Sequence, residues 1–167
     1  KKVYLWVELG LQTINDETAE NFNRGYKFEV FKEGIKKLQD RGIEVVVHSI
    51  FGLPGETKED MLRTIDYIAH SGAQGIKFHL LHLMKNTKMA EQYYNGEFEL
   101  LSEEDYIDLI CQGISMIPEE MVVHRLTGDA PRATLIGPMW SLKKWEVLNA
   151  IDKALVDRDI WQGKNFK

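Results

Sequence analysis

Cysteine is almost missing from this sequence, since Cys111 is the one example among 167 residues. A single thiol forms no disulfide within the chain and cannot build an all-thiolate zinc or iron–sulfur site. Cys111 falls on the apolar face of the helix expected over residues 102–117, which favours an inert core thiol. We therefore expect a protein of a reducing, cytoplasmic compartment.

Long apolar runs and a surplus of positive charge are missing as well. No apolar stretch approaches the roughly 20 residues that cross a bilayer, and no signal-peptide pattern opens the sequence. The net charge is −5, so no basic surface indicates a nucleic-acid partner. The first residues, KKVYLWVELGLQ, run straight into a strand pattern without a preceding methionine. We expect no membrane partner, and we expect a piece of a longer chain.

Hydrophobic residues make up 44% of the chain and charged residues 28%, which suits one globular domain over residues 1–167. Runs of strand type alternate with helical periodicity, and Asn15, Thr57, Ser102 and Ser141 are the expected helix caps. Strands are expected over residues 3–9, 43–51, 75–84 and 121–126. Helices are expected after Asn15 and over residues 27–41, 58–71, 102–117 and 141–159.

This alternation predicts a parallel sheet with right-handed crossovers. Four strands do not close an eight-stranded barrel of the TIM type. The expected fold class is therefore α/β, either as an open sheet or as one arc of a TIM-like (β/α) barrel.

Polar side chains share one face of the expected sheet. Successive side chains of a strand point to opposite faces, so Glu8, His48, Lys77 and His79 lie opposite an apolar face. A parallel sheet covered on both sides is apolar on both, which favours a ligand cavity on the polar face. The alternative is a structural network in which Lys77 pairs with Glu44 or Glu8.

Histidines and charged loop residues offer further candidates. His79 and His82 are three apart on one expected strand and point to opposite faces, so we expect no zinc site. The segment HRLTGDAPR is either a salt-bridged turn or an anion contact, because arginine forks suit carboxylate or phosphate. It contributes four candidates: His124, Arg125, Asp129 and Arg132.

The stretch HSIFGLPGET, residues 48–57, follows the apolar run GIEVVV and contains the end of the second expected strand. It lacks the glycine spacing and the lysine of a phosphate-binding loop. Its Gly-Leu-Pro-Gly turn allows backbone groups to approach a ligand closely.

Three stretches, taken in their order along the chain, indicate a protein family more specifically than any one of them alone. They are VELGLQTINDETAENFNRGY, VVVHSIFGLPGET and HLLHLMKNTKMAEQYYNGEF. Together they resemble the second half of a radical S-adenosylmethionine (SAM) domain. The subgroup they resemble contains the Elongator catalytic subunit and oxygen-independent coproporphyrinogen oxidase. The tail, HRLTGDAPR with the later WSLKKWEVLNAID, is similar to the YhcC-type proteins of that superfamily.

This resemblance implies a partial (β/α)6 barrel of which residues 1–167 are the C-terminal half. It implies an Fe-S oxidoreductase-like enzyme whose [4Fe-4S] cluster, held by a CxxxCxxC loop upstream, cleaves SAM reductively to a 5′-deoxyadenosyl radical. The sequence has no CxxxCxxC motif, so we expect this chain alone to hold no cluster and to be inactive. The implied partners are an unidentified substrate, the N-terminal half in cis and an electron donor for the cluster.

The family pattern also implies site residues. Gln12 and Arg24 match polar SAM contacts, with Arg24 on the SAM carboxylate, and Glu8 lies beside the ribose or the substrate. His48 stands where related enzymes commonly carry an aspartate that contacts SAM. The rest of the implied SAM pocket is formed by Gly52, Leu53, Pro54, Leu81 and Leu83. The implied substrate side comprises Lys77, His79, His124, Arg125, Asp129 and Arg132.

Two hypotheses of other classes accompany this one. The chain is alternatively a non-catalytic α/β binding or scaffolding module. A third reading is a half-barrel that self-associates through exposed sheet edges.

Overall fold

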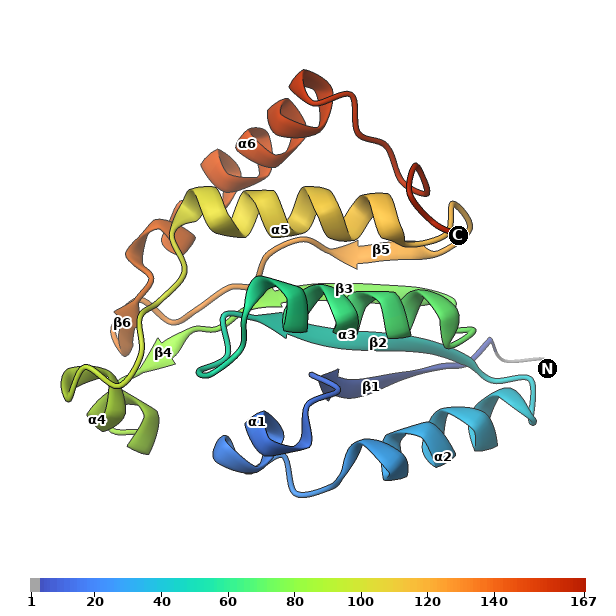
Figure 1. Cartoon of the computed structure of the whole chain (residues 1–167), viewed down its shortest axis with the longest axis horizontal. Coiled ribbons are helices and arrows are strands. Elements are labelled where there is room, and N and C mark those ends of the chain that lie inside the picture. The colour runs from blue at the N-terminus through green and yellow to red at the C-terminus, as the bar shows by residue number, and fades with distance from the viewer. Residues whose placement is uncertain (1–3) are drawn as a thin grey trace.

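The structure is a computed structural model that describes residues 4–167. Four parallel strands form the main sheet in the order β1-β2-β3-β5 (Figure 1). They are β1 (Trp6–Gln12), β2 (Glu44–Phe51), β3 (Gly75–Leu80) and β5 (Val122–Arg125). The helices are α1 (Asp16–Asn21), α2 (Phe28–Gln39), α3 (Lys58–His70), α4 (Lys88–Tyr94), α5 (Glu103–Met116), η1 (Met139–Leu142) and α6 (Lys144–Asp157).

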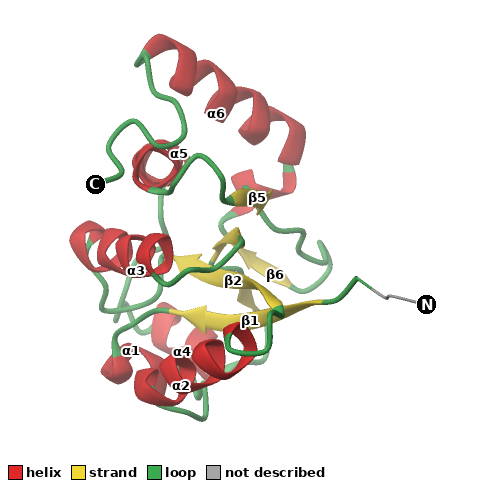
Figure 2. Ribbon diagram, turned by 90° about the vertical axis from the view of Figure 1, so that its right-hand side faces the viewer, coloured by secondary structure: helices red, strands yellow, loops and turns green. Residues whose placement is uncertain are grey.

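The helices α2, α3 and α5 pack on one face of this sheet (Figure 2). Strand residues such as Val47, Ile76 and Phe78 are fully buried against them, as the alternation of the sequence predicts. The other face leaves Trp6 46% exposed and Val122 55% exposed in the described part of the chain. The expected α/β class with a mostly parallel sheet is therefore confirmed. Helices cover one face of the sheet and leave the other open, as in a partial barrel.

The expected caps of three helices are confirmed. Asn15 accepts hydrogen bonds from the first-turn amides of α1, and Ser102 does the same for α5. Thr57 and Asp60 form a reciprocal capping box at the start of α3. These caps satisfy amides that have no partner within the helix and so fix where each helix begins.

The expected strand over residues 75–84 is wrong in its second half. β3 ends at Leu80, and β4 (Leu83–Met84) pairs antiparallel with β6 (Leu135–Gly137) in a separate two-stranded sheet. The sequence around Leu81 carries no glycine or proline, so nothing local marked this end. The partner strand β6 lies in a stretch for which the sequence predicts a loop. Helix α4 was not predicted either.

Smaller corrections concern the two ends of the chain. The first strand spans residues 6–12 instead of 3–9, and Val3 lies outside the described residues. The final helix begins at Lys144, and Ser141 does not cap it because its hydroxyl donates to the carbonyl oxygen of Pro138. Within residues 4–167 no helix is long and apolar enough to span a bilayer.

The packing of α6 generates a matched pair of stability predictions. Ile151 is 0% exposed and Val156 is 80% exposed on the same helix. Ile151→Ala should lower the free energy of unfolding by about 2–5 kcal/mol because it leaves a cavity in the core. Val156→Ala should change it by less than about 0.5 kcal/mol. Urea denaturation measures both, and equal losses would show that α6 does not pack as described.

Candidate functional site

The polar face of the sheet is organised by the carboxylate of Glu8. Lys77 Nζ donates to both Glu8 oxygens at 2.6 Å, and His48 Nε2 lies 2.9 Å from Oε2. Parallel pairing sets His48 directly beside Lys77. The Lys77 ammonium, with help from His48, holds the pKa of Glu8 at about 2. The carboxylate of Glu8 on β1 thus binds side chains of both β2 and β3. Of the two expected partners of Lys77, Glu8 and Glu44, the structure shows Glu8.

Two neutral imidazoles lie next to this carboxylate. Burial lowers the pKa of His48 more than Glu8 raises it, so His48 is a hydrogen-bond donor to Glu8 without being its counter-ion. His79 stacks on His48 with ring centroids 5.1 Å apart. Burial, reinforced by neighbouring positive groups, lowers the pKa of His79 to about 4. The Nε2 atom of His79 is buried without a hydrogen-bond partner among the described residues.

Gln12 ends β1 in a left-handed backbone conformation, with φ at 59°. Its side chain folds back over Gly10 so closely that an added Cβ there would overlap the Gln12 amide group. With the nitrogen turned toward the backbone, the amide donates to the carbonyl oxygens of Gly10 at 3.0 Å and Leu11 at 3.1 Å. Tyr26 donates its hydroxyl to the carbonyl of Gly10 as well. Glycine at position 10 is therefore required for Gln12 to take this place.

Arg24 has its guanidinium almost fully used inside the protein. Its side chain is 2% exposed, and it donates to the carbonyls of Leu11, Thr13 and Tyr26 and to the carboxylate of Asp16. Four N–H bonds of a guanidinium that has five are engaged in this way. In this structure Arg24 fixes the loop after β1, the loop that presents Gln12.

The turn of residues 52–55 follows β2, as the sequence predicts. Gly52 has φ at +88°, and the side chain of Leu101 packs where its Cβ would stand. Leu53 is buried and Pro54 half-buried. Glu56, just after the turn, accepts a hydrogen bond from Thr13, and burial raises its pKa. This contact joins the turn to the loop held by Arg24.

Leu81 and Leu83 line a cavity of about 300 Å³ at the carboxyl end of β3. Leu81 continues the sheet pattern through a 2.9 Å bond from its N–H to the carbonyl of Phe51. The other walls come from the end of α1 and from α4: Asn21, Phe22, Asn23, Thr87, Lys88, Met89 and Gln92, with His82 and Met84 beside the leucines. Sites of parallel sheets form at this end of the strands, so the cavity lies where a ligand is expected.

The candidates of the segment HRLTGDAPR separate in space. Arg125 pairs in register with Lys77, and His124 covers Gly75. Asp129 binds Lys144 through both oxygens at 2.8 and 2.9 Å, and Arg132 is exposed. The structure therefore brings Arg125 and His124 to the polar face, and Asp129 forms a salt bridge with α6 instead.

The sequence did not predict His82 as a site residue. The prediction that its side chain points to the face opposite His79 is wrong. Because β3 ends at Leu80, His82 turns back toward His79, and both rings approach Gly128. Its Nε2 is buried without a partner among the described residues, and burial lowers its pKa. No signal in the sequence revealed this, since the chain turns here through pairing with a distant strand. Within residues 4–167 no cluster of His, Cys, Asp or Glu is arranged to hold a metal ion.

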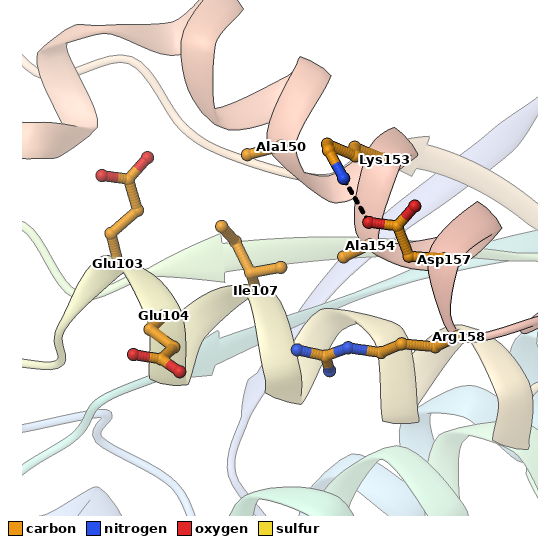
Figure 3. Close-up of a pocket in the computed structure, with 8 residues that line it drawn as sticks. All are labelled: Glu103, Glu104, Ile107, Ala150, Lys153, Ala154, Asp157 and Arg158. Atoms are coloured by element: carbon orange, nitrogen blue, oxygen red, sulfur yellow. Dashed lines mark hydrogen bonds and ion pairs between the residues drawn. The ribbon is translucent and has the colours of Figure 1, made fainter.

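A separate cavity of about 490 Å³ lies on the outer helices, between α5 and α6 (Figure 3). Its floor is apolar through Ile107, Ala150 and Ala154, and its rims carry charges of both signs. It is formed by helices alone and contains none of the residues implied by the family pattern, so we do not assign the site to it.

Two family models match the chain along most of its length. The Radical SAM superfamily model matches residues 1–68, and the Radical_SAM C-terminal domain model matches residues 73–157. The chain belongs to the radical SAM superfamily. The motifs quoted from its sequence thus indicated the correct family.

Individual relatives agree with this assignment. Uncharacterized protein YtqA of Bacillus subtilis is 50% identical over 167 residues, which is 100% of this radical SAM chain and 52% of the relative. Protein YhcC of Escherichia coli K12 is 34% identical over 93% of this chain and 50% of its own length. The solved structure of archaeal Methanocaldococcus infernus Elp3 with an N-terminal deletion is 22% identical, covers 95% of this chain and 37% of its own, and superposes with a TM-score of 0.83. This last likeness confirms the fold.

The radical SAM chain spans about half the length of the curated relatives that it matches. Its residues fit SAM better than they fit an iron–sulfur cluster. The cavity at the carboxyl end of β3 combines the apolar side chains of Leu81 and Leu83 with polar ones such as Asn21 and Gln92, a mixed lining that suits SAM. The single thiol, Cys111, is 0% exposed in the core, so it is no cluster ligand.

The network around Glu8 yields a titration prediction. In the wild type the Glu8 carboxyl should stay ionised down to about pH 2. Lys77→Met should move its pKa up toward the ordinary value of about 4.3, since the main partner of the charged form is lost. Carboxyl-carbon NMR measures both values. Lys36→Met, which removes an exposed pair with Asp40, is the control that should leave Glu8 unchanged. A wild-type pKa near 4.3 would refute the network.

His79 yields a second titration prediction. Its ring should titrate near pH 4 in the folded protein, against about 6.5 when unfolded. The unfolded state then binds the proton first, so His79 should lower stability as the pH falls from about 6.5 toward 4. His70 is the internal control, because carbonyl oxygens of Lys167 and Asp66 raise its pKa. Ring-proton NMR follows both, and a His79 pKa above that of His70 would contradict the described burial.

Proposed function

We propose that this chain is the SAM- and substrate-binding half of a radical SAM enzyme whose cluster-binding half precedes it. The observation that carries the proposal is the polar face of Glu8, Lys77, His48 and His79, in a chain of this superfamily, beside a cavity at the carboxyl ends of the strands. A parallel sheet covered on both faces is normally apolar on both, so a polar face beneath a covering second half favours a ligand site.

Exposed apolar side chains support a second half that covers the sheet. Tyr4 is 69% exposed and Trp6 46%, and Val122 at the opposite edge is 55% exposed. Contiguous apolar surface of this kind marks an interaction surface. We propose that the preceding half of the full-length protein closes over it and completes the barrel.

The SAM site of the proposal is built from the carboxyl ends of β1, β2 and β3. Gln12 and the backbone of Gly52, Leu53 and Pro54 form its rim, and Leu81 and Leu83 form its adenine side. Arg24 affects SAM binding indirectly, because its N–H groups bind backbone carbonyls of the loop that carries Gln12 and hold that loop in place. Glu56 and Thr13 tie this loop to the turn after β2.

When bound together, SAM and a reduced [4Fe-4S] cluster would supply the 5′-deoxyadenosyl radical that removes a hydrogen atom from a substrate. The residues of this chain would orient the reactants. Glu8 and Lys77 neutralise each other and hold His48 in place, while His79 stacks a neutral ring on His48. An electron donor for the cluster and a cytoplasmic location complete the proposal.

The test is SAM binding by the full-length protein after anaerobic reconstitution with iron and sulfide, followed by calorimetry. Gln12→Ala and His48→Ala should each weaken SAM binding about tenfold, equivalent to about 1.4 kcal/mol. His70→Ala is the matched histidine control, because His70 binds carbonyls at the end of α3, away from the polar face. No saturable SAM binding by the reconstituted wild type would refute the proposed function and favour a non-catalytic binding module.

A further inference from the structure

A cavity of about 470 Å³ opens beside β5, the edge strand of the main sheet, and the first turns of α6. Seven residues line it: Val123, His124, Arg125, Leu126, Thr127, Lys144 and Leu148. This volume falls within the range of small-molecule sites, roughly 300–1,000 Å³. The walls combine apolar surface with a few polar groups, as such sites do.

The cavity contains basic side chains and no carboxylate. Lys144 is already paired, since its Nζ binds both oxygens of Asp129. Arg125 is exposed and makes no ion pair or side-chain hydrogen bond within residues 4–167. A guanidinium with all its donors available presents the planar fork that carboxylate and phosphate groups accept.

Arg125 also borders the polar face of the sheet. It pairs in register with Lys77, whose positive charge is compensated by the carboxylate of Glu8. Its positive charge contributes to the lowered pKa of both His48 and His79, as expected for a cation beside this face of the sheet. The two histidines are neutral, so the summed charge of Glu8, Lys77 and Arg125 is positive. Lys77 is paired with Glu8 and Lys144 with Asp129, so Arg125 is the cationic side chain of this cavity that has no ion-pair partner within residues 4–167.

We infer that this cavity binds the anionic group of a small molecule, a carboxylate or a phosphate, with the guanidinium of Arg125 as its anchor. Resting on the proposed function, the inference assigns an anionic compound as the substrate class, with its charged group beside β5. The remainder of the molecule then extends over Lys77 and His79 toward the carboxyl ends of the strands.

The experiment titrates inorganic phosphate and, in a second arm, succinate into the full-length protein without SAM, at constant ionic strength. Backbone NMR shifts of residues 122–127 report the site. We expect saturable binding with a dissociation constant on the order of 1 mM for at least one anion, and the tighter of the two identifies the group. Arg125→Ala should weaken it at least about tenfold, and Arg125→Lys about threefold, because lysine keeps the charge but loses the fork.

Arg41→Ala is the matched control. It removes the same charge from an exposed arginine whose guanidinium binds the carbonyl of Lys37 at the end of α2, and it should leave anion binding unchanged. If Arg41→Ala weakens anion binding as much as Arg125→Ala does, the effect comes from the net charge of the protein, and the inference is overturned. If neither anion shows saturable binding at concentrations up to about ten times the expected dissociation constant, the inference is overturned as well.

The two proposals can fail separately. Anion binding that depends on Arg125, in a protein that binds no SAM, would keep the anion site and refute the proposed function together with the assignment of the anion as substrate. SAM binding that is intact in a protein without anion binding would refute only the anionic substrate.

Discussion

The carboxylate of Glu8 is the interaction on which the rest of the site depends. It accepts two hydrogen bonds from Lys77 and one from His48, and so joins three strands across the uncovered face of the sheet. Without Glu8, Lys77 would lie beside Arg125 as an uncompensated like charge, and His48 would lose the partner that fixes its ring. This ion pair therefore sets both the electrostatics and the side-chain order of the polar face.

A second set of contacts holds the carboxyl ends of the strands. Arg24 binds backbone carbonyls of the loop after β1, and Thr13 of that loop binds Glu56 after the turn of β2. Loops are the mobile part of most parallel-sheet sites, and here buried polar bonds restrain two of them against each other. The rim is thereby shaped before any ligand arrives, which reduces the entropy lost on binding.

Much of this arrangement could be predicted from residue alternation. Period-two patterning placed Glu8, His48 and Lys77 on one face and Val47 and Phe78 on the other, because strand geometry is local. The end of β3 could not be predicted, since β4 pairs with β6 across some fifty residues of sequence. The position of His82 depends on that pairing and was missed with it. The burial of Arg24 is likewise a tertiary effect, because its partners are backbone carbonyls that no residue pattern encodes.

The central claim is that this chain supplies the binding half of a radical SAM enzyme. The most direct measurement is the formation of 5′-deoxyadenosine by the full-length protein after anaerobic cluster reconstitution, with dithionite as the electron source and SAM as the reactant. The account predicts 5′-deoxyadenosine in the presence of dithionite and none in its absence. A protein that carries an intact reduced cluster and yet forms no 5′-deoxyadenosine from SAM would contradict it.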